Sequence, residues 1–216
     1  MLPVTALMIT TGIAATATGT VPDPLADPGT GATASGGLVH STAKLRVKRH
    51  AMAGGTIRLR GRLRPAAARR VTVRINGEKV KTVRTGADGR FRVLWSAPGP
   101  GVYEAKAVTQ ASGQARMARS RVREINVYRP AVASYYGPGL YGNGTACGQT
   151  LTPGTHGVAN KSLPCGEKVT LRYRARTVTV PVIDRGPFSG DREYDLTAAT
   201  KAKLGFGDVG TVLTTR

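Results

Sequence analysis

The feature that most limits the fold is a two-residue alternation of apolar and polar side chains, repeated in short runs from about residue 43 onward. The runs at 57–63, 71–75 and 91–95 are separated by Gly, Pro, Asn or Asp. This period is typical of strands that bury one face. No apolar run reaches the roughly 18–20 residues that a membrane-spanning helix needs. The pattern predicts an all-β protein.

The charge predicts where the chain divides. The formal net charge is +20 over 216 residues. Residues 1–42 contain two acidic and no basic side chains, whereas residues 43–128 contain 21 basic and four acidic ones. Residues 129–216 contain 11 basic and six acidic side chains. The change near residue 128 predicts two domains, and so basic a surface attracts polyanions.

The N-terminal stretch indicates export. Residues 1–17 have the apolar core of a secretory signal peptide, and Ala15-Thr16-Ala17 offers small residues for cleavage, although no Lys or Arg precedes the core. Residues 18–42 are rich in Pro, Gly, Ala, Thr, Ser and Asp, which predicts a disordered spacer. We therefore expect a secreted or cell-envelope protein without a transmembrane segment in the mature chain.

Residues 43–128 predict an antiparallel β-sandwich, with a hairpin turn at Asn76-Gly77. The pattern Gly-x-Ile-x-Leu-x-Gly at 55–61, with Ala-Asp-Gly-x-Phe and Gly-Val-Tyr further on, resembles bacterial Ig-like modules. The predicted fold of this part is an Ig-like β-sandwich.

Four arginines of this part, at positions 58, 60, 62 and 64, lie on one face of a predicted strand. Same-face neighbours on a strand are about 6.7 Å apart, inside the Debye length of about 8 Å at physiological salt. Two interpretations stay open: a solvated basic face, or a face that binds an anionic polymer of the cell envelope through phosphate or carboxylate groups. Nucleic acid is not expected as a partner, because this part has few aromatic residues for base stacking.

Cys147 and Cys165 are the only cysteines. A disulfide between them closes a loop of about 19 residues and implies an oxidising compartment; two buried free thiols are the alternative. His40, His50 and His156 are not spaced for a zinc site with these cysteines, so no metal is expected.

One stretch near the end holds the candidate acid. Val178, Val180 and Val182 alternate with other residues up to Asp184, and the strand breaks at Arg185-Gly186-Pro187. A carboxylate at a strand end is fixed in position yet open to a ligand. Asp184 could instead only accept backbone N–H groups in the turn. Asp195 follows eleven residues later.

Local signals complete the C-terminal part. Strands are predicted around 168–173 and 177–183. Thr197 is suited to cap a short helix that ends at Gly205. The last strand is predicted at 210–215.

The final residues also carry a set of ordered motifs: Ala133-Ser-Tyr-Tyr-Gly137, Thr145-Ala146, Leu163-Pro164-x-Gly166, Asp184-Arg-Gly-Pro-Phe188, Asp195-Leu-Thr197, Leu204-Gly205 and Gly210-Thr-Val212. This order resembles the rare lipoprotein A (RlpA) family of septal lytic transglycosylases. The resemblance implies a six-stranded double-psi β-barrel with a short helix at 132–216. It also implies cleavage of the β-1,4 bond between N-acetylmuramic acid and N-acetylglucosamine in peptidoglycan, without water and without a cofactor.

The resemblance assigns roles to single residues. Asp184 matches the family's Asp and is the expected general acid and base. Asp195 also matches and either holds the barrel together or tunes Asp184. Gln149 and Asn160 stand where the family commonly has Glu and His, and neither amide can shuttle a proton near neutral pH. The expected substrate-binding residues are Tyr136, Gln149, Asn160, Arg185 and Asp195.

Three functions follow from these residues. The first is a secreted peptidoglycan lytic transglycosylase with a basic Ig-like targeting domain. The second is a non-catalytic, expansin-like protein that binds glycan in its groove, which the replacement of Glu and His favours. The third is a basic adhesin that binds the envelope or nucleic acid, in which the barrel is only a scaffold.

Overall fold

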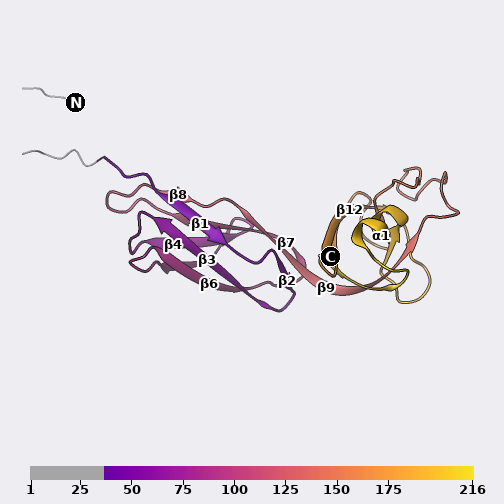
Figure 1. Ribbon diagram of the computed structural model, residues 1–216, viewed down its shortest axis with the longest axis horizontal. Helices are drawn as coiled ribbons and strands as arrows, with labels where there is room; N and C mark the ends of the chain where they lie inside the picture. Colours follow the sequence, from indigo (N-terminus) through magenta and orange to yellow (C-terminus); the bar gives the residue numbers. More distant parts are fainter. Residues whose placement is uncertain (1–36) are drawn as a thin grey trace, which may run out of the picture. The chain divides into compact units, whose positions relative to one another are not determined.

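The computed structural model describes residues 37–216 (Figure 1). The predicted signal peptide at 1–17 lies outside the described residues, as does the predicted spacer up to residue 36. The described part is all β except for one helix of seven residues. Within it, no helix is long and apolar enough to cross a membrane.

The strands of the N-terminal part are β1 (Thr42–Arg46), β2 (His50–Met52), β3 (Thr56–Arg64), β4 (Arg70–Ile75), β5 (Glu78–Arg84), β6 (Arg90–Ser96), β7 (Gly101–Thr109) and β8 (Ala118–Arg119). The remaining elements are β9 (Arg123–Tyr136), β10 (Val158–Asn160), β11 (Lys168–Tyr173), β12 (Arg176–Asp184), β13 (Tyr194–Thr197), α1 (Ala198–Leu204) and β14 (Gly210–Thr214).

The N-terminal strands form two sheets around one core. One sheet has the order β1-β3-β6, and the other pairs the first part of β9 with β7, then β4 and β5. Leu59 and Val93 from the first sheet lie in the same buried cluster as Val73, Ala105 and Ile125 from the second. The alternation read from the sequence therefore arises because each strand turns one face to this shared core. The assignment to the Ig-like class stays a prediction.

The hairpin predicted at Asn76-Gly77 is confirmed. It joins β4 to β5, and both residues have positive φ, 49° at Asn76 and 84° at Gly77. Positive φ at both central residues is what a two-residue hairpin of type I′ requires.

The N-terminal part begins before residue 43. Val39 pairs with Ala115, and Ser41 is buried. The buried guanidinium of Arg69 donates to the Ser41 hydroxyl over 3.0 Å and to the carbonyl of Arg116 over 2.8 Å. The end of the predicted spacer is thus ordered, because it supplies a hydrogen-bond acceptor that a buried cation needs.

Residues 129–131, which lie between the two parts predicted from the sequence, are not a linker, because they belong to β9. The second half of β9 belongs to the C-terminal sheet: it pairs antiparallel with β14 and parallel with β13. From β14 the pairing continues through β11, β12 and β10 to β13, so six strands close on themselves. This closure confirms the expected six-stranded barrel.

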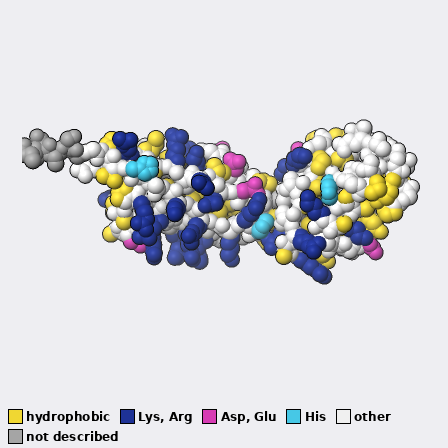
Figure 2. Space-filling view, turned by 45° about the horizontal axis from the view of Figure 1, so that its top comes forward, with side chains coloured by type: hydrophobic (Ala, Val, Ile, Leu, Met, Phe, Trp, Pro, Cys, Tyr) yellow, Lys and Arg dark blue, Asp and Glu magenta, His cyan; other side chains and the backbone are white. Residues whose placement is uncertain are grey.

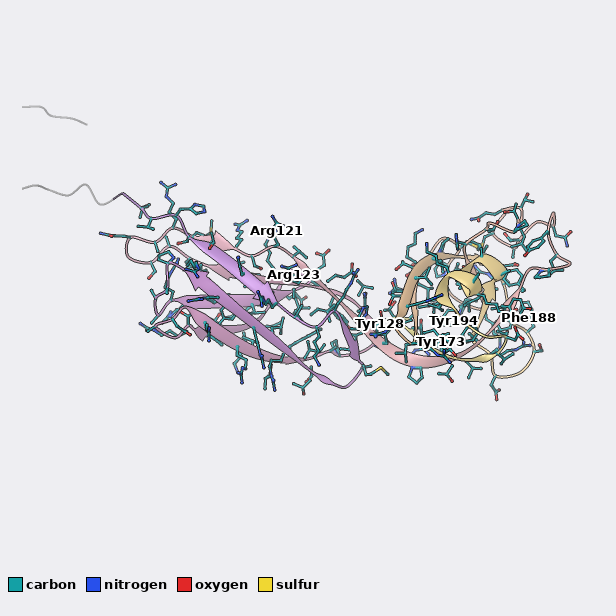
Figure 3. All side chains as sticks on the ribbon, in the orientation of Figure 1. Arg121, Arg123, Tyr128, Tyr173, Phe188 and Tyr194 are labelled. Atoms are coloured by element: carbon teal, nitrogen blue, oxygen red, sulfur yellow. A yellow bond between two sulfur atoms is a disulfide. The ribbon has the colours of Figure 1, made fainter. Side chains whose placement is uncertain are left out.

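The barrel interior is filled by apolar side chains, among them Val169, Leu171, Val180 and Leu196. Tyr194 is also fully buried, and its hydroxyl accepts a hydrogen bond from Thr214 (Figure 3). Burial raises the pKa of Tyr194 to about 12.

The predicted helix is confirmed, as are both of its ends. The Thr197 side chain accepts a hydrogen bond from the Thr200 amide, and Gly205 follows in the left-handed conformation with φ 65°. The helix packs on β12 and β13. It thereby supports the two strands that carry the candidate carboxylates.

Candidate active site

Asp184 stands at the end of β12, and a β-bulge just before it sets the direction of its side chain. Val182 and Ile183 are both fully buried, so the alternation breaks there. The pairing with β10 shifts at the same place, since Val158 pairs with Val182 and Ala159 with Asp184. An extra residue of this kind bends a strand and redirects the next side chain.

The bulge needs a glycine opposite it. A Cβ at position 157 would lie 2.5 Å from the side chain of Ile183, closer than any real contact. Gly157 therefore makes room for Ile183, and Asp184 emerges half-buried at the rim of the barrel.

The Asp184 carboxylate is held by one of its two oxygens. Oδ1 accepts hydrogen bonds from the Ala146 amide over 2.9 Å and from the Arg185 amide over 2.8 Å. Within residues 37–216, Oδ2 accepts no hydrogen bond of good geometry. One oxygen thus fixes the carboxyl group and leaves the other for a ligand or a proton.

Asp195 lies in the same row of the barrel wall. Ala159 pairs with Asp184 on one side and with Asp195 on the other, and Asp195 pairs in turn with Ser134 on β9. The Ser134 hydroxyl donates to Oδ1 of Asp195 over 2.7 Å, and Arg192 donates to that hydroxyl over 3.0 Å.

The pKa of Asp195 is raised above its ordinary value, chiefly by burial. The hydrogen bond from Ser134 and the charge of Arg192 oppose the rise, and the nearby charge of Asp184 adds to it. Asp195 therefore holds its proton more firmly than a carboxyl group in water does.

Tyr136 extends toward both carboxylates. Its hydroxyl oxygen is buried and makes no hydrogen bond of good geometry within the described residues. Burial raises the pKa of Tyr136, and the charges of Asp184 and Asp195 raise it further. The phenol therefore stays neutral and keeps a proton to donate at the site.

Gln149 lies in a tight loop beside Asp184. The Thr145 amide donates to the carbonyl of Gln149 over 2.7 Å, and the Gln149 amide donates to the Thr145 hydroxyl over 3.2 Å. The Gln149 side chain is exposed. The predicted disulfide between Cys147 and Cys165 is present and ties this loop to the one after β10.

Asn160 and Arg185 are engaged inside the protein. The buried Asn160 side chain accepts hydrogen bonds from the Ser162 and Leu163 amides and donates to the carbonyl of Glu193. Arg185 donates to the carbonyls of Asn160 and Leu163, over 3.2 Å and 2.9 Å. Both side chains shape the loop at 160–165, and this use was not expected from the sequence.

Phe188 is a candidate that the sequence analysis did not single out. It follows Asp184 by four residues and is 82% exposed (Figure 3). Tyr141 is also exposed, at 38%. The available signal for Phe188 in the sequence was its place in the Asp-Arg-Gly-Pro-Phe motif that begins at Asp184. His156 is exposed.

These observations define a closed six-stranded barrel with a carboxylate at its rim and a second one in the same row. Residues 132–214 match the family model described as "Lytic transglycolase". This segment is an RlpA-like double-psi β-barrel domain.

Curated relatives agree with that assignment. The "Probable endolytic peptidoglycan transglycosylase RlpA" of Synechocystis sp. is 36% identical over 88 residues, 40% of this chain and 27% of the relative. The "Endolytic peptidoglycan transglycosylase RlpA" of Pseudomonas aeruginosa is 41% identical over 93 residues, 42% of this chain and 27% of the relative. That of Haemophilus influenzae is 33% identical over 110 residues, 50% of this chain and 36% of the relative.

The matched segments thus span between about a quarter and about a third of these relatives. Among solved structures, the Streptomyces papain inhibitor is 25% identical over 41% of this chain and 94% of that chain, with a TM-score of 0.31. So low a score supports no argument about function.

Proposed function

We propose that the barrel domain is a peptidoglycan lytic transglycosylase with Asp184 as its general acid and base. One observation carries this proposal: Asp184 has one oxygen fixed by two backbone amides and the other open at the rim. Relatives of the domain are named endolytic peptidoglycan transglycosylases, which supports the choice of substrate.

The reaction needs only one acid. Neutral Asp184 gives its proton to the oxygen of the β-1,4 bond between N-acetylmuramic acid and N-acetylglucosamine, and the bond from the muramyl C1 to that oxygen breaks. The Asp184 carboxylate then takes the proton of the muramyl C6 hydroxyl, whose oxygen attacks C1. The products are a 1,6-anhydromuramyl end and a free N-acetylglucosamine hydroxyl, and Asp184 is protonated again. The nucleophile belongs to the substrate, so no water has to be activated.

The neighbouring groups favour this chemistry in distinct ways. Tyr136 supplies a neutral donor for a sugar oxygen or for the Asp184 carboxylate formed during the reaction. Asp195, whose pKa is raised chiefly by burial, carries less negative charge beside Asp184 than a carboxyl group in water would at the same pH. The exposed amide of Gln149 is free to bind a sugar hydroxyl or an N-acetyl group.

Two other residues position the groove. Arg185 and Asn160 hold the loop at 160–165 through the hydrogen bonds described above, and we assign them this positioning role within the substrate-binding set. Phe188 offers an exposed ring against which a pyranose face can pack.

The location follows from the substrate. Peptidoglycan lies outside the cytoplasmic membrane, so the proposal requires export to the cell envelope or beyond. The disulfide agrees with this location, because such bonds persist in oxidising compartments.

The second candidate function is glycan binding without cleavage, as in expansins. It is favoured by Gln149 and Asn160, which stand where the family commonly has Glu and His and cannot transfer protons near neutral pH.

The test is mass spectrometry of purified sacculi after incubation with the protein. The wild type should release 1,6-anhydromuropeptides, and Asp184→Asn should release roughly 10²- to 10⁴-fold less. Asp191→Asn is the matched control, since Asp191 is an exposed carboxylate nearby. Products with reducing ends would mean hydrolysis instead. No products, with the wild type still sedimenting with sacculi, would establish the binding protein.

A further inference from the structure

The outer face of the β1-β3-β6 sheet is a continuous basic surface. Its cations form two rows across the strands, because Arg62 pairs with Lys44 and Arg90, and Arg60 pairs with Arg46 and Arg92. We call the following eight side chains the basic face: Lys44, Arg46, Arg58, Arg60, Arg62, Arg64, Arg90 and Arg92. Figure 2 shows Lys and Arg side chains gathered along the N-terminal part.

These cations are exposed, except for the half-buried Arg62, and most of them line one hollow of the surface. Gly61 and Phe91 also line this hollow, and the Phe91 ring is buried in the core on the inner side of the sheet. A shallow basic hollow of this kind suits an extended ligand that passes over several strands.

The arrangement is unfavourable without a ligand. Side chains directly opposite each other on paired strands have Cβ atoms about 4.5–5.5 Å apart, and like charges there are destabilising. One carboxylate lies close: Asp88 pairs with Arg90 at 3.3 Å. The remaining positive charge is uncompensated on this face, which favours an anion bound above it.

The other sheet of the same part differs. Its strands carry Glu78, Glu104 and Glu124 among their cations, and Glu124 pairs with Arg49 at 3.0 Å. The positive charge is therefore not spread evenly over the two sheets. The strands of the β1-β3-β6 sheet contain no Asp or Glu, whereas those of the other sheet do.

We propose that the basic face binds a linear polymer of phosphate diesters that lacks bases. Seven of its eight cations are arginines. The planar guanidinium group of arginine can donate two parallel hydrogen bonds to the oxygens of one phosphate. On β3 they recur at about 6.7 Å, a spacing that a chain of repeating charges can follow.

Two other polyanionic partners fit less well. Within β1, β3 and β6, no aromatic side chain is exposed, so the face offers no platform for stacked bases. Leu94 is the one large apolar side chain exposed on these strands, which gives little to insert into a bilayer.

The test measures binding of a glycerol phosphate polymer to the full chain by titration at several salt concentrations. The face variant carries Arg46→Gln, Arg60→Gln and Arg92→Gln. The control variant carries Lys79→Gln, Lys81→Gln and Arg84→Gln on β5, so it loses the same charge from exposed positions. Thermal melts of both variants verify that they are folded.

The wild type should bind the polymer far more tightly than monomeric glycerol phosphate. Its affinity should fall on the order of 10³-fold between 50 and 200 mM salt if six cations contact phosphates. The face variant should lower the slope of log affinity against log salt by about 2, and the control variant should retain it. Equal losses in both variants would overturn the proposal, because net charge alone would then explain binding.

Two further probes separate the partners. Tighter binding to phosphatidylglycerol vesicles or to oligo-dT than to the polymer would overturn the choice of partner. This proposal does not depend on catalysis, since the face variant leaves Asp184 and its surroundings intact and should release muropeptides from sacculi in solution as the control variant does.

Discussion

Asp184 and Asp195 pair with the same residue, Ala159, from opposite sides, and so lie in one row of the barrel wall. Because the strand of Ala159 lies between the strands of the two aspartates, their Cα atoms are two strand spacings apart, or about 10 Å. The buried methyl group of Ala159 is the side chain that lies between them in this row. Tyr136 lies near this row, since burial and then the charges of both carboxylates raise the pKa of its phenol.

The first prediction concerns the pH dependence of stability. The folded pKa of Asp195 is raised by burial, so the folded state binds its proton more tightly than the unfolded state. This contribution to stability is present below the unfolded pKa of about 3.9 and is lost as the pH rises through the folded pKa. Asp195→Asn should therefore lose less stability than the wild type between pH 4 and pH 7, as measured by urea unfolding.

Asn keeps an oxygen that can accept the bond from Ser134, so the substitution changes the charge more than the contacts. Asp191→Asn is the control, and its pH profile should follow the wild type. An Asp195→Asn profile parallel to the wild type would contradict the assignment of the buried charge.

The second prediction concerns the disulfide. Cys147 and Cys165 are 18 residues apart, and a loop of this length corresponds to about 3 kcal/mol in the free energy of unfolding. The Cys147 amide also donates to the carbonyl of Ile183, next to Asp184. A reducing agent should thus lower both the melting temperature and the release of muropeptides. The double variant Cys147→Ser, Cys165→Ser should not respond to the reductant, and a response there would mean a different cause.

The third prediction separates two residues that the sequence analysis grouped together. Asn160→Ala should cost about 1–3 kcal/mol of stability, because the Ser162 and Leu163 amides lose their acceptor. Gln149→Ala should leave the melting temperature unchanged, since its side chain is exposed, but should weaken binding to sacculi. The reverse pattern would mean that Asn160, not Gln149, touches the glycan.

The sequence predicted much of this architecture because local rules decide it. Strand alternation, the Asn76-Gly77 hairpin and the Thr197 cap each depend on a few neighbouring residues. Barrel closure was expected only through the family resemblance, since pairing between strands distant in sequence leaves no local pattern.

Other features depend on tertiary contacts and were not predicted. The bulge at Ile183 needs the empty space at Gly157, which is 26 positions away. Nothing in the sequence distinguishes Arg69 from the other arginines of this basic part. Its side chain is nevertheless buried, and it donates hydrogen bonds to the Ser41 hydroxyl and to the carbonyls of Gln110 and Arg116. The role of Asn160 in its own loop was hidden for the same reason.

The last prediction concerns Gly61, on which the basic face depends. A Cβ at this position would lie 2.1 Å from the ring of Phe91 and 2.5 Å from the carbonyl oxygen of Lys44. The ring can turn aside, but the carbonyl belongs to β1 and can move only with its strand. Gly61→Ala should therefore cost about 1–3 kcal/mol by overpacking.

Gly99→Ala is the matched control in the same part of the chain, because nothing lies within 4 Å of its added Cβ. Urea unfolding should show a loss for Gly61→Ala and little change for Gly99→Ala. If the β1–β3 pairing shifts as expected, Gly61→Ala should also weaken polymer binding, since Arg46 and Arg60 would no longer lie side by side. Unchanged stability would mean that β1 is free to move away from β3, and that the two rows of cations are not rigidly spaced.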